Sequence, residues 1–180
     1  METFFELLKS RHSIRKYLAK IVESDKIDTI TKAALMSPAS KRSNSWEFIV
    51  VQDTEMLEKL SNCRPHGSQF LAKAPLGIVV IADTSKSDVW IEDASIAAII
   101  LQLQVQDLGL GSCWIQVYQR QKDENTTTEA YIRELLNIPD NYAVLNIISI
   151  GYPNEERKSY DEEKLAIKKI HSEKYENSLI

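Results

Sequence analysis

The chain has 180 residues, of which 43% are hydrophobic and 27% are charged, the composition of an ordinary globular domain. Its formal net charge of −4 argues against a nucleic-acid binder, because that class carries a basic surface. The two cysteines and three histidines lie far apart, so they predict neither a disulfide framework nor a metal site. No apolar run reaches the roughly 20 residues of a membrane span, and we expect a cytoplasmic protein.

The first 17 residues combine a short helix with a polar stretch. Phe4, Phe5 and Leu8 lie on one face of the predicted helix. The following stretch, RHSIRKY at positions 11–17, gathers basic and hydroxyl side chains in a chain that is acidic overall. Arginine and serine donate hydrogen bonds to anions, so the stretch predicts a local anion site. A basic surface segment that follows a helix is the alternative.

The next part of the chain alternates helices, loops and strands. The predicted elements are a helix that Ser24 caps and that ends near Pro38, a polar loop over 37–45, a strand over 46–51, a helix that Asp53 or Thr54 caps, and a strand over 76–82. The last of these, LGIVVIA, is a near-continuous apolar run, which is typical of a strand covered on both faces.

Residues 89–108 predict one long helix that is apolar on most sides, so we expect it to run through the middle of the protein. Strands are predicted over residues 112–117 and 144–152, with a capped helix between them that ends before Pro139. The chain contains neither GxGxxG nor GxxxxGKS, so both common phosphate-binding loops are absent from the sequence.

The last 27 residues differ in character from the rest. They are mostly charged with sparse apolar positions, so they are either disordered or laid along another surface such as a second subunit. We therefore expect one domain, with residues 1–153 as its body and 154–180 as a C-terminal arm. The pattern of helices around a sheet of about four strands predicts the α+β class.

Several stretches together resemble one family, the nitroreductase-like flavoproteins. They are RHSIRKY, SPASKRSNSWEF, KAPLGIVVIAD, VWIEDASIAAIIL followed by GLGSCWI, ISIGYP and KIHSEKY, in family order over residues 7–175. The resemblance implies an α+β fold with a central mixed sheet of about four or five strands flanked by helices. It also implies a homodimer with FMN at the subunit interface and a C-terminal arm that wraps the partner subunit.

The same resemblance implies the chemistry. FMN is the expected cofactor and NADH or NADPH the expected electron donor, with ping-pong hydride transfer through flavin N5 to a nitroaromatic, a quinone or a related small electrophile. No catalytic side chain is required, because the flavin carries the chemistry. Flavin enzymes with other chemistry (dehalogenation, ring dehydrogenation, flavin breakdown) and a non-catalytic FMN-binding module remain alternatives.

The resemblance also assigns binding residues near the two chain ends. Arg11 and Ser13 are expected to take the FMN phosphate, completed by Arg157 or Lys158, for which a solvated charge run is the alternative. Arg15 is expected beside flavin N1, where a fixed cation stabilises the reduced ring. His12 is expected either to contact the ribityl chain or to cap a turn.

Further binding residues are expected from the middle of the chain. Pro38, Ala39 and Ser40 match positions that lie along the flavin in the partner subunit. Arg42, Asn44 and Ser45 depart from the family pattern, and this puts the substrate class in doubt more than flavin binding; Asn44 still offers an amide to the pyrimidine edge.

The other face of the ring is expected to meet the main chain around Ile115 and Gln116. Gln69 lies in a loop that often touches the flavin in the family. We expect no metal, no nucleic acid and no membrane among the partners.

Overall fold

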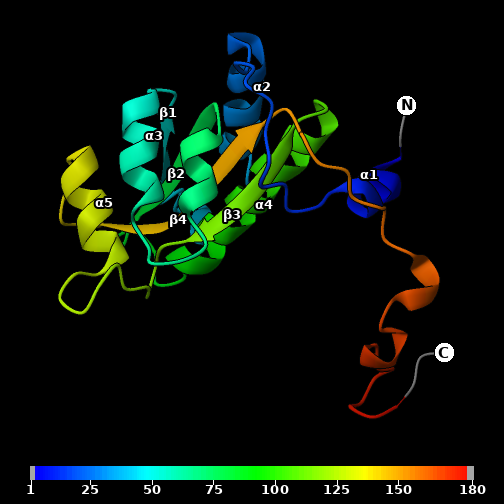
Figure 1. Ribbon diagram of the computed structural model, residues 1–180. Helices are drawn as coiled ribbons and strands as arrows, with labels where there is room; N and C mark the ends of the chain where they lie inside the picture. Colours follow the sequence, from blue (N-terminus) through cyan, green and yellow to red (C-terminus); the bar gives the residue numbers. More distant parts are fainter. Residues whose placement is uncertain (1–2, 178–180) are drawn as a thin grey trace.

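The computed structural model describes residues 3–177 and contains helices around one sheet (Figure 1). The helices are α1 (Phe4–Ser10), α2 (Ser24–Leu35), α3 (Thr54–Ser61), α4 (Trp90–Asp107) and α5 (Thr128–Leu136). The strands are β1 (Trp46–Val51), β2 (Leu76–Asp83), β3 (Gly111–Gln116) and β4 (Tyr142–Gly151). Short 3-10 turns are η1 (Ser40–Arg42), η2 (Gln69–Lys73), η3 (Glu162–Lys164) and η4 (Ile167–Lys169). The predicted α+β class is confirmed.

The four strands lie in the order β1-β2-β4-β3, and each neighbouring pair is antiparallel. The expected sheet was mixed, whereas the single Ser13–Ser112 bridge is the one parallel pairing found between residues 3 and 177. The reason lies in the connection through α4. It joins β2 to β3, which do run parallel to each other, but β4 is inserted between them. A strand–helix–strand pattern in the sequence therefore does not produce neighbouring parallel strands here.

Two apolar layers cover the two faces of the sheet (Figure 1). One layer packs α2 and α4 against β2 and β4, and Ala97, Ala98 and Leu101 of α4 are fully buried in it. The other layer packs α3, α5 and η2 against the opposite face. Both central strands are buried along almost their whole length, as the continuous apolar runs predicted.

The long central helix was expected to be surrounded by protein, and this holds for only part of its surface. Ile96 and Ile99 on its outer side are 40% and 39% exposed. The short helix α1 packs near this side and leaves Phe4 65% exposed. An apolar helix with one uncovered face needs a further surface to bury it.

Local sequence signals set several helix ends. The Asp53 carboxylate accepts a hydrogen bond from the Met56 N–H at 2.8 Å and caps α3, which decides between the two predicted capping residues. Gly109 follows α4 with a φ of +72°, a conformation that glycine adopts without steric cost. No helix within residues 3–177 is long and apolar enough to cross a membrane.

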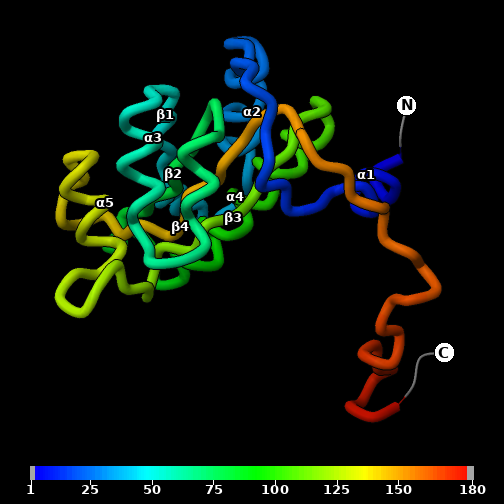
Figure 2. The backbone as a smooth tube through the Cα atoms, viewed as in Figure 1, coloured from blue at the N-terminus to red at the C-terminus, as the bar shows by residue number. Residues whose placement is uncertain are grey.

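The C-terminal segment leaves the body of the protein next to α1 (Figure 2). Its first part, residues 154–162, is called the arm root here. The Asn154 N–H donates to Lys16 O at 2.8 Å and the Tyr160 N–H donates to Lys9 O at 3.0 Å, so the arm root runs alongside residues 9–16. Residues 156–170 are all exposed. Beyond its contacts with residues 9–16, the segment therefore buries little of itself on its own protomer, as its sparse apolar residues predicted.

Candidate cofactor site

The predicted anion-binding stretch, residues 11–17, is called the clamp segment here, and it lies against the start of β3. The Ile14 N–H donates to Ser112 O at 2.9 Å, and Ser13 forms the parallel bridge with Ser112. This close approach depends on Gly111. A Cβ at that position would lie 2.7 Å from Ile14 Cγ1 and 2.8 Å from Ile14 Cβ, which is shorter than van der Waals contact allows.

The clamp segment presents polar side-chain groups that have no protein partner among residues 3–177. Within residues 3–177, neither the Arg11 nor the Arg15 guanidinium pairs with a carboxylate, and the Arg15 guanidinium lies over the Phe70 ring, 5.8 Å from its centroid. The His12 Nε2 atom is buried and has no hydrogen-bond partner in the same part of the chain. Uncompensated arginine forks beside an unpartnered imidazole nitrogen are the chemistry that suits a phosphate-bearing group.

The positive charges of the clamp segment influence the pKa of the Cys113 thiol on β3. Burial raises the pKa of this thiol, and the nearby charges of Arg15 and Arg11 lower it in part. Because burial dominates, Cys113 is a buried thiol and not an activated nucleophile.

A carboxylate from the arm root organises the clamp backbone. Glu155 Oε1 accepts hydrogen bonds from the Arg15 N–H at 2.6 Å and the Lys16 N–H at 3.1 Å, and these bonds lower the pKa of Glu155. Glu155 also pairs with Arg157 at 2.7 Å. Of the two predicted phosphate ligands, Arg157 is thus partly neutralised, while Lys158 has no ion pair within the described chain. Arg157 and Lys158 both belong to the arm root, which runs beside the clamp segment.

The predicted 37–45 loop is held at the opposite end of α4 by a buried carboxylate. Asp93, in the first turn of α4, is 3% exposed and accepts from the Ser40 N–H at 2.8 Å and from the Ser43 hydroxyl at 3.2 Å. Ser87 donates to the same carboxylate at 3.0 Å. Sequence reasoning missed Asp93, because an acid in the first turn of a helix is explained equally well by the helix dipole.

Three residues of this loop have left-handed backbone conformations without being glycine. The φ angles are 52° for Lys41, 57° for Arg42 and 42° for Asn44. Pro38, Arg42 and Asn44 are exposed, and no side-chain hydrogen bond or ion pair holds Arg42 within residues 3–177. Such conformations persist only where surrounding contacts fix them, as the bonds to Asp93 do here.

The clamp segment and the 37–45 loop do not converge within one protomer. Gln106, in the last turn of α4, donates to the Ser10 hydroxyl at 3.2 Å, next to the clamp segment. Asp93, which holds the loop, lies near the other end of the same helix. At a rise of about 1.5 Å per residue the two ends are about 20 Å apart.

The predicted contacts from β3 and from the loop before β2 are available mainly through the backbone. Ile115 is 1% exposed, and the Gln116 amide is engaged by the Trp114 indole N–H at 2.8 Å and by Tyr118 O at 3.0 Å. The Gln69 amide accepts from the Gly67 N–H at 2.9 Å and donates to main-chain carbonyls, so it holds its own loop together.

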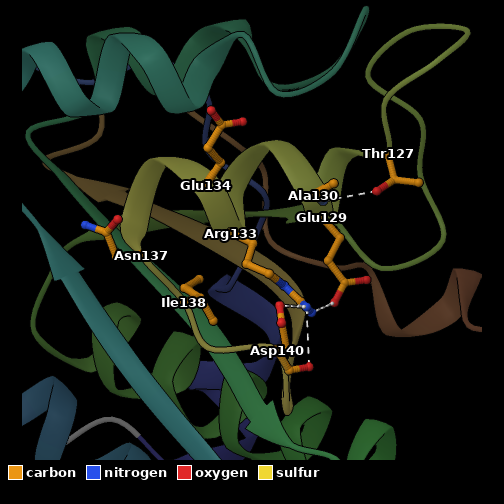
Figure 3. Close-up of a pocket in the computed structure, with 8 residues that line it drawn as sticks. All are labelled: Thr127, Glu129, Ala130, Arg133, Glu134, Asn137, Ile138 and Asp140. Atoms are coloured by element: carbon orange, nitrogen blue, oxygen red, sulfur yellow. Dashed lines mark hydrogen bonds and ion pairs between the residues drawn. The ribbon is translucent and has the colours of Figure 1, made fainter.

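A cavity of about 670 Å³ lies elsewhere, along α5 (Figure 3). Its central cation, Arg133, pairs with Glu129 at 3.2 Å and with Asp140 at 3.4 Å (Figure 3). Glu129 also accepts from the Val144 N–H at 3.0 Å, so these charges fasten α5 to β4. None of the predicted site residues lines this cavity, and its arginine is already neutralised.

Comparisons with known sequences and with known structures both match this chain to nitroreductases. A family model described as the Nitroreductase family matches residues 8–63 and 60–152. An FMN-dependent nitroreductase from Clostridium difficile R20291 has a similar structure, with a TM-score of 0.94 and 55% identity over 95% of this chain and 99% of that one.

Two further relatives are similar to this chain in sequence. An Archaeoglobus fulgidus protein, provisionally named NADH dehydrogenase/NAD(P)H nitroreductase, is 37% identical over 97% of this chain and 100% of its own length. Iodotyrosine deiodinase 1 of Rattus norvegicus is 37% identical over 59 residues, which are 33% of this chain and 21% of that protein.

Proposed function

The chain belongs to the nitroreductase family, and from that premise we propose that it is an FMN-dependent oxidoreductase. It takes electrons from NADH or NADPH and reduces nitroaromatics, quinones or related small electrophiles. The observation that carries the proposal is the clamp segment, where Arg11 and Arg15 have no carboxylate partner within residues 3–177 and His12 Nε2 is buried without one. When bound, FMN supplies a ring that accepts hydride from a nicotinamide and passes it on.

The chain's own residues bind and orient the cofactor. Arg11 and Ser13 hold the phosphate from the clamp segment, and Lys158 or Arg157 adds a second cation from the arm root. Glu155 keeps the backbone of Arg15 in place through two hydrogen bonds. No carboxylate neutralises the Arg15 guanidinium within the described residues, so its full charge is available to stabilise a reduced ring.

The site is shared between two copies of the chain. Pro38, Ala39, Ser40, Arg42 and Asn44 contribute from the partner, because their loop lies about 20 Å along α4 from the clamp segment of the same protomer. The uncovered apolar side of α4 supports this assembly. Ile96 and Ile99 are each about 40% exposed in one protomer, and a second copy buries them.

An anaerobic visible spectrum tests the proposal. The purified protein is reconstituted with FMN and recorded before and after addition of NADH or NADPH. Bleaching of the oxidised flavin bands is the expected result, and the nicotinamide that causes it identifies the donor. A flavin spectrum that stays oxidised with both nicotinamides would refute the NAD(P)H reductase.

Two variants tie this test to the clamp segment. Arg11→Ala is expected to bind FMN much more weakly, because a charge-assisted hydrogen bond to phosphate is lost. Arg120→Ala removes an exposed arginine in the turn after β3 and serves as the matched control. Equal FMN affinity in both variants would remove Arg11 from the phosphate site.

Reductive dehalogenation is the second candidate, favoured by the 59-residue similarity to iodotyrosine deiodinase 1. The two functions differ in the acceptor. Nitrobenzene derivatives and iodinated phenols are offered to the reduced, FMN-loaded protein, and reoxidation is followed. Reoxidation by the nitro compound supports the nitroreductase, while release of iodide without turnover of the nitro compound supports the dehalogenase.

A further inference from the structure

The arm root places an aromatic ring on the clamp segment. The His12 and Tyr160 rings are stacked, with centroids 4.7 Å apart and planes inclined by 23°. The stack leaves the His12 Nε2 atom buried, and nothing within residues 3–177 hydrogen bonds to it. Tyr160 therefore packs on one face of the His12 imidazole, and within the described chain the Nε2 atom of that imidazole is free to accept or donate a further hydrogen bond.

The position of Tyr160 is fixed independently of the stack. Its N–H donates to Lys9 O at 3.0 Å. The Lys9 ammonium pairs with Glu162 at 2.9 Å and with Glu6 at 2.7 Å, which joins the next turn of the arm to α1. The hydrogen bonds that Lys9 donates to Glu6 and Glu162 raise the pKa of Lys9. Several contacts thus hold Tyr160 beside the clamp segment, although 51% of its surface is exposed.

We propose that Tyr160 is a positioning residue for the cofactor, because its stack on His12 orients the imidazole so that Nε2 meets the polar chain of the bound FMN. The inference rests on the proposed function. An imidazole turns readily about its χ2 bond, and a stacked ring restricts that rotation. Fixing the ring before binding removes an entropic cost that binding would otherwise bear.

The same contact couples the arm to the cofactor. If docking of the arm root favours FMN binding through His12, bound FMN favours docking of the arm root by the same factor. Tyr160 lies in the root of the C-terminal arm, residues 154–180, which is expected to wrap the partner subunit, and the rest of the arm follows this contact. FMN occupancy and the placement of the arm therefore influence each other through one pair of aromatic rings.

Equilibrium FMN binding by the full-length protein tests the inference, with quenching of flavin fluorescence as the readout. Tyr160→Leu keeps apolar bulk and removes the stack, and we expect about three- to tenfold weaker binding. Tyr160→Phe keeps the ring and is expected to stay within about twofold of the wild type. Tyr175→Leu is the matched control, because Tyr175 contacts His171 farther along the same arm at 4.8 Å and should leave FMN affinity unchanged.

A double-mutant cycle distinguishes positioning from a general structural role. In a His12→Ala background, Tyr160→Leu should change FMN affinity by less than about twofold, because its effect passes through His12. Additive losses would overturn the inference, as would a Tyr160→Leu protein with wild-type affinity or a Tyr160→Phe protein as weak as Tyr160→Leu. The proposed function survives these three results. A wild-type chain that binds no FMN would instead refute the proposed function and this inference together.

Discussion

Gly111→Ala should displace the clamp segment from β3 and weaken the cofactor site. The added Cβ would lie 2.7, 2.8 and 2.9 Å from the three Ile14 atoms Cγ1, Cβ and Cγ2. Carbon atoms in contact are separated by about 3.5–4.0 Å, so Ile14 must retreat by about 1 Å. Overpacking of this kind costs about 1–3 kcal/mol. The Ile14 N–H to Ser112 O bond, now 2.9 Å, would lengthen beyond hydrogen-bonding range.

Two assays follow the effect of this variant. Urea denaturation gives the loss of unfolding free energy, and fluorescence titration gives FMN affinity. A hydrogen bond to a charged group contributes about 1.5–3 kcal/mol, and a displacement of about 1 Å is enough to break one, so we expect FMN affinity to fall at least about tenfold.

Gly77→Ala is the matched control, because its Cβ would meet the flexible end of Leu57 at 3.0 Å, away from the clamp segment. That variant should lose some stability and retain FMN affinity. Wild-type FMN affinity in Gly111→Ala would refute the role assigned to the contact between β3 and the clamp segment.

Three further predictions concern other parts of the protein. Asp93→Ala leaves the Ser40 N–H and two serine hydroxyls without their acceptor and should lower the unfolding free energy by about 2–4 kcal/mol, measured in urea; a loss below about 1 kcal/mol would contradict this. The hydrogen bond from Tyr152 lowers the pKa of Glu23 from 4.5 to about 2, so Glu23 stabilises the fold fully above pH 4.5 and loses this effect as pH falls toward 2. Glu23→Gln should therefore reduce the difference in thermal stability between pH 6 and pH 2.5, and an unchanged difference would contradict it. Arg15→Gln should lower the midpoint potential of bound FMN by on the order of 30 mV, measured against reference dyes, and an unchanged potential would exclude Arg15 from the ring.

Much of the fold could be predicted because its signals are local. The continuous apolar runs of β2 and β4 indicated strands covered on both faces, and both are buried almost throughout. The apolar composition of α4 indicated a helix with packing on more than one side. The C-terminal arm was predicted from its charge and its few apolar residues, which are too sparse to bury the segment.

The features that were missed depend on contacts between distant residues. Nothing near Asp93 in the sequence indicates that it binds a loop some 50 residues earlier, because serine hydroxyls and backbone N–H groups are present everywhere. In the sequence, Tyr160 is one aromatic residue among charged ones, and nothing there indicates a contact with His12. The contact arises because the arm root runs beside the clamp segment. The insertion of β4 between β2 and β3 likewise depends on strand order, which hydrophobic periodicity does not encode.

The contacts that fix the 37–45 loop suit the proposed site, which a second copy of the chain completes. Left-handed conformations at Lys41, Arg42 and Asn44 cost about 1–2 kcal/mol each, and a loop with no external task would relax them. The buried carboxylate of Asp93 instead holds the loop rigid at the end of α4 that lies far from its own clamp segment. A rigid loop loses little entropy when it meets a partner, whereas a flexible one would have to be ordered on binding. In the proposed dimer, the strained loop of one protomer therefore lies preorganised beside the cofactor that the clamp segment of the other protomer binds.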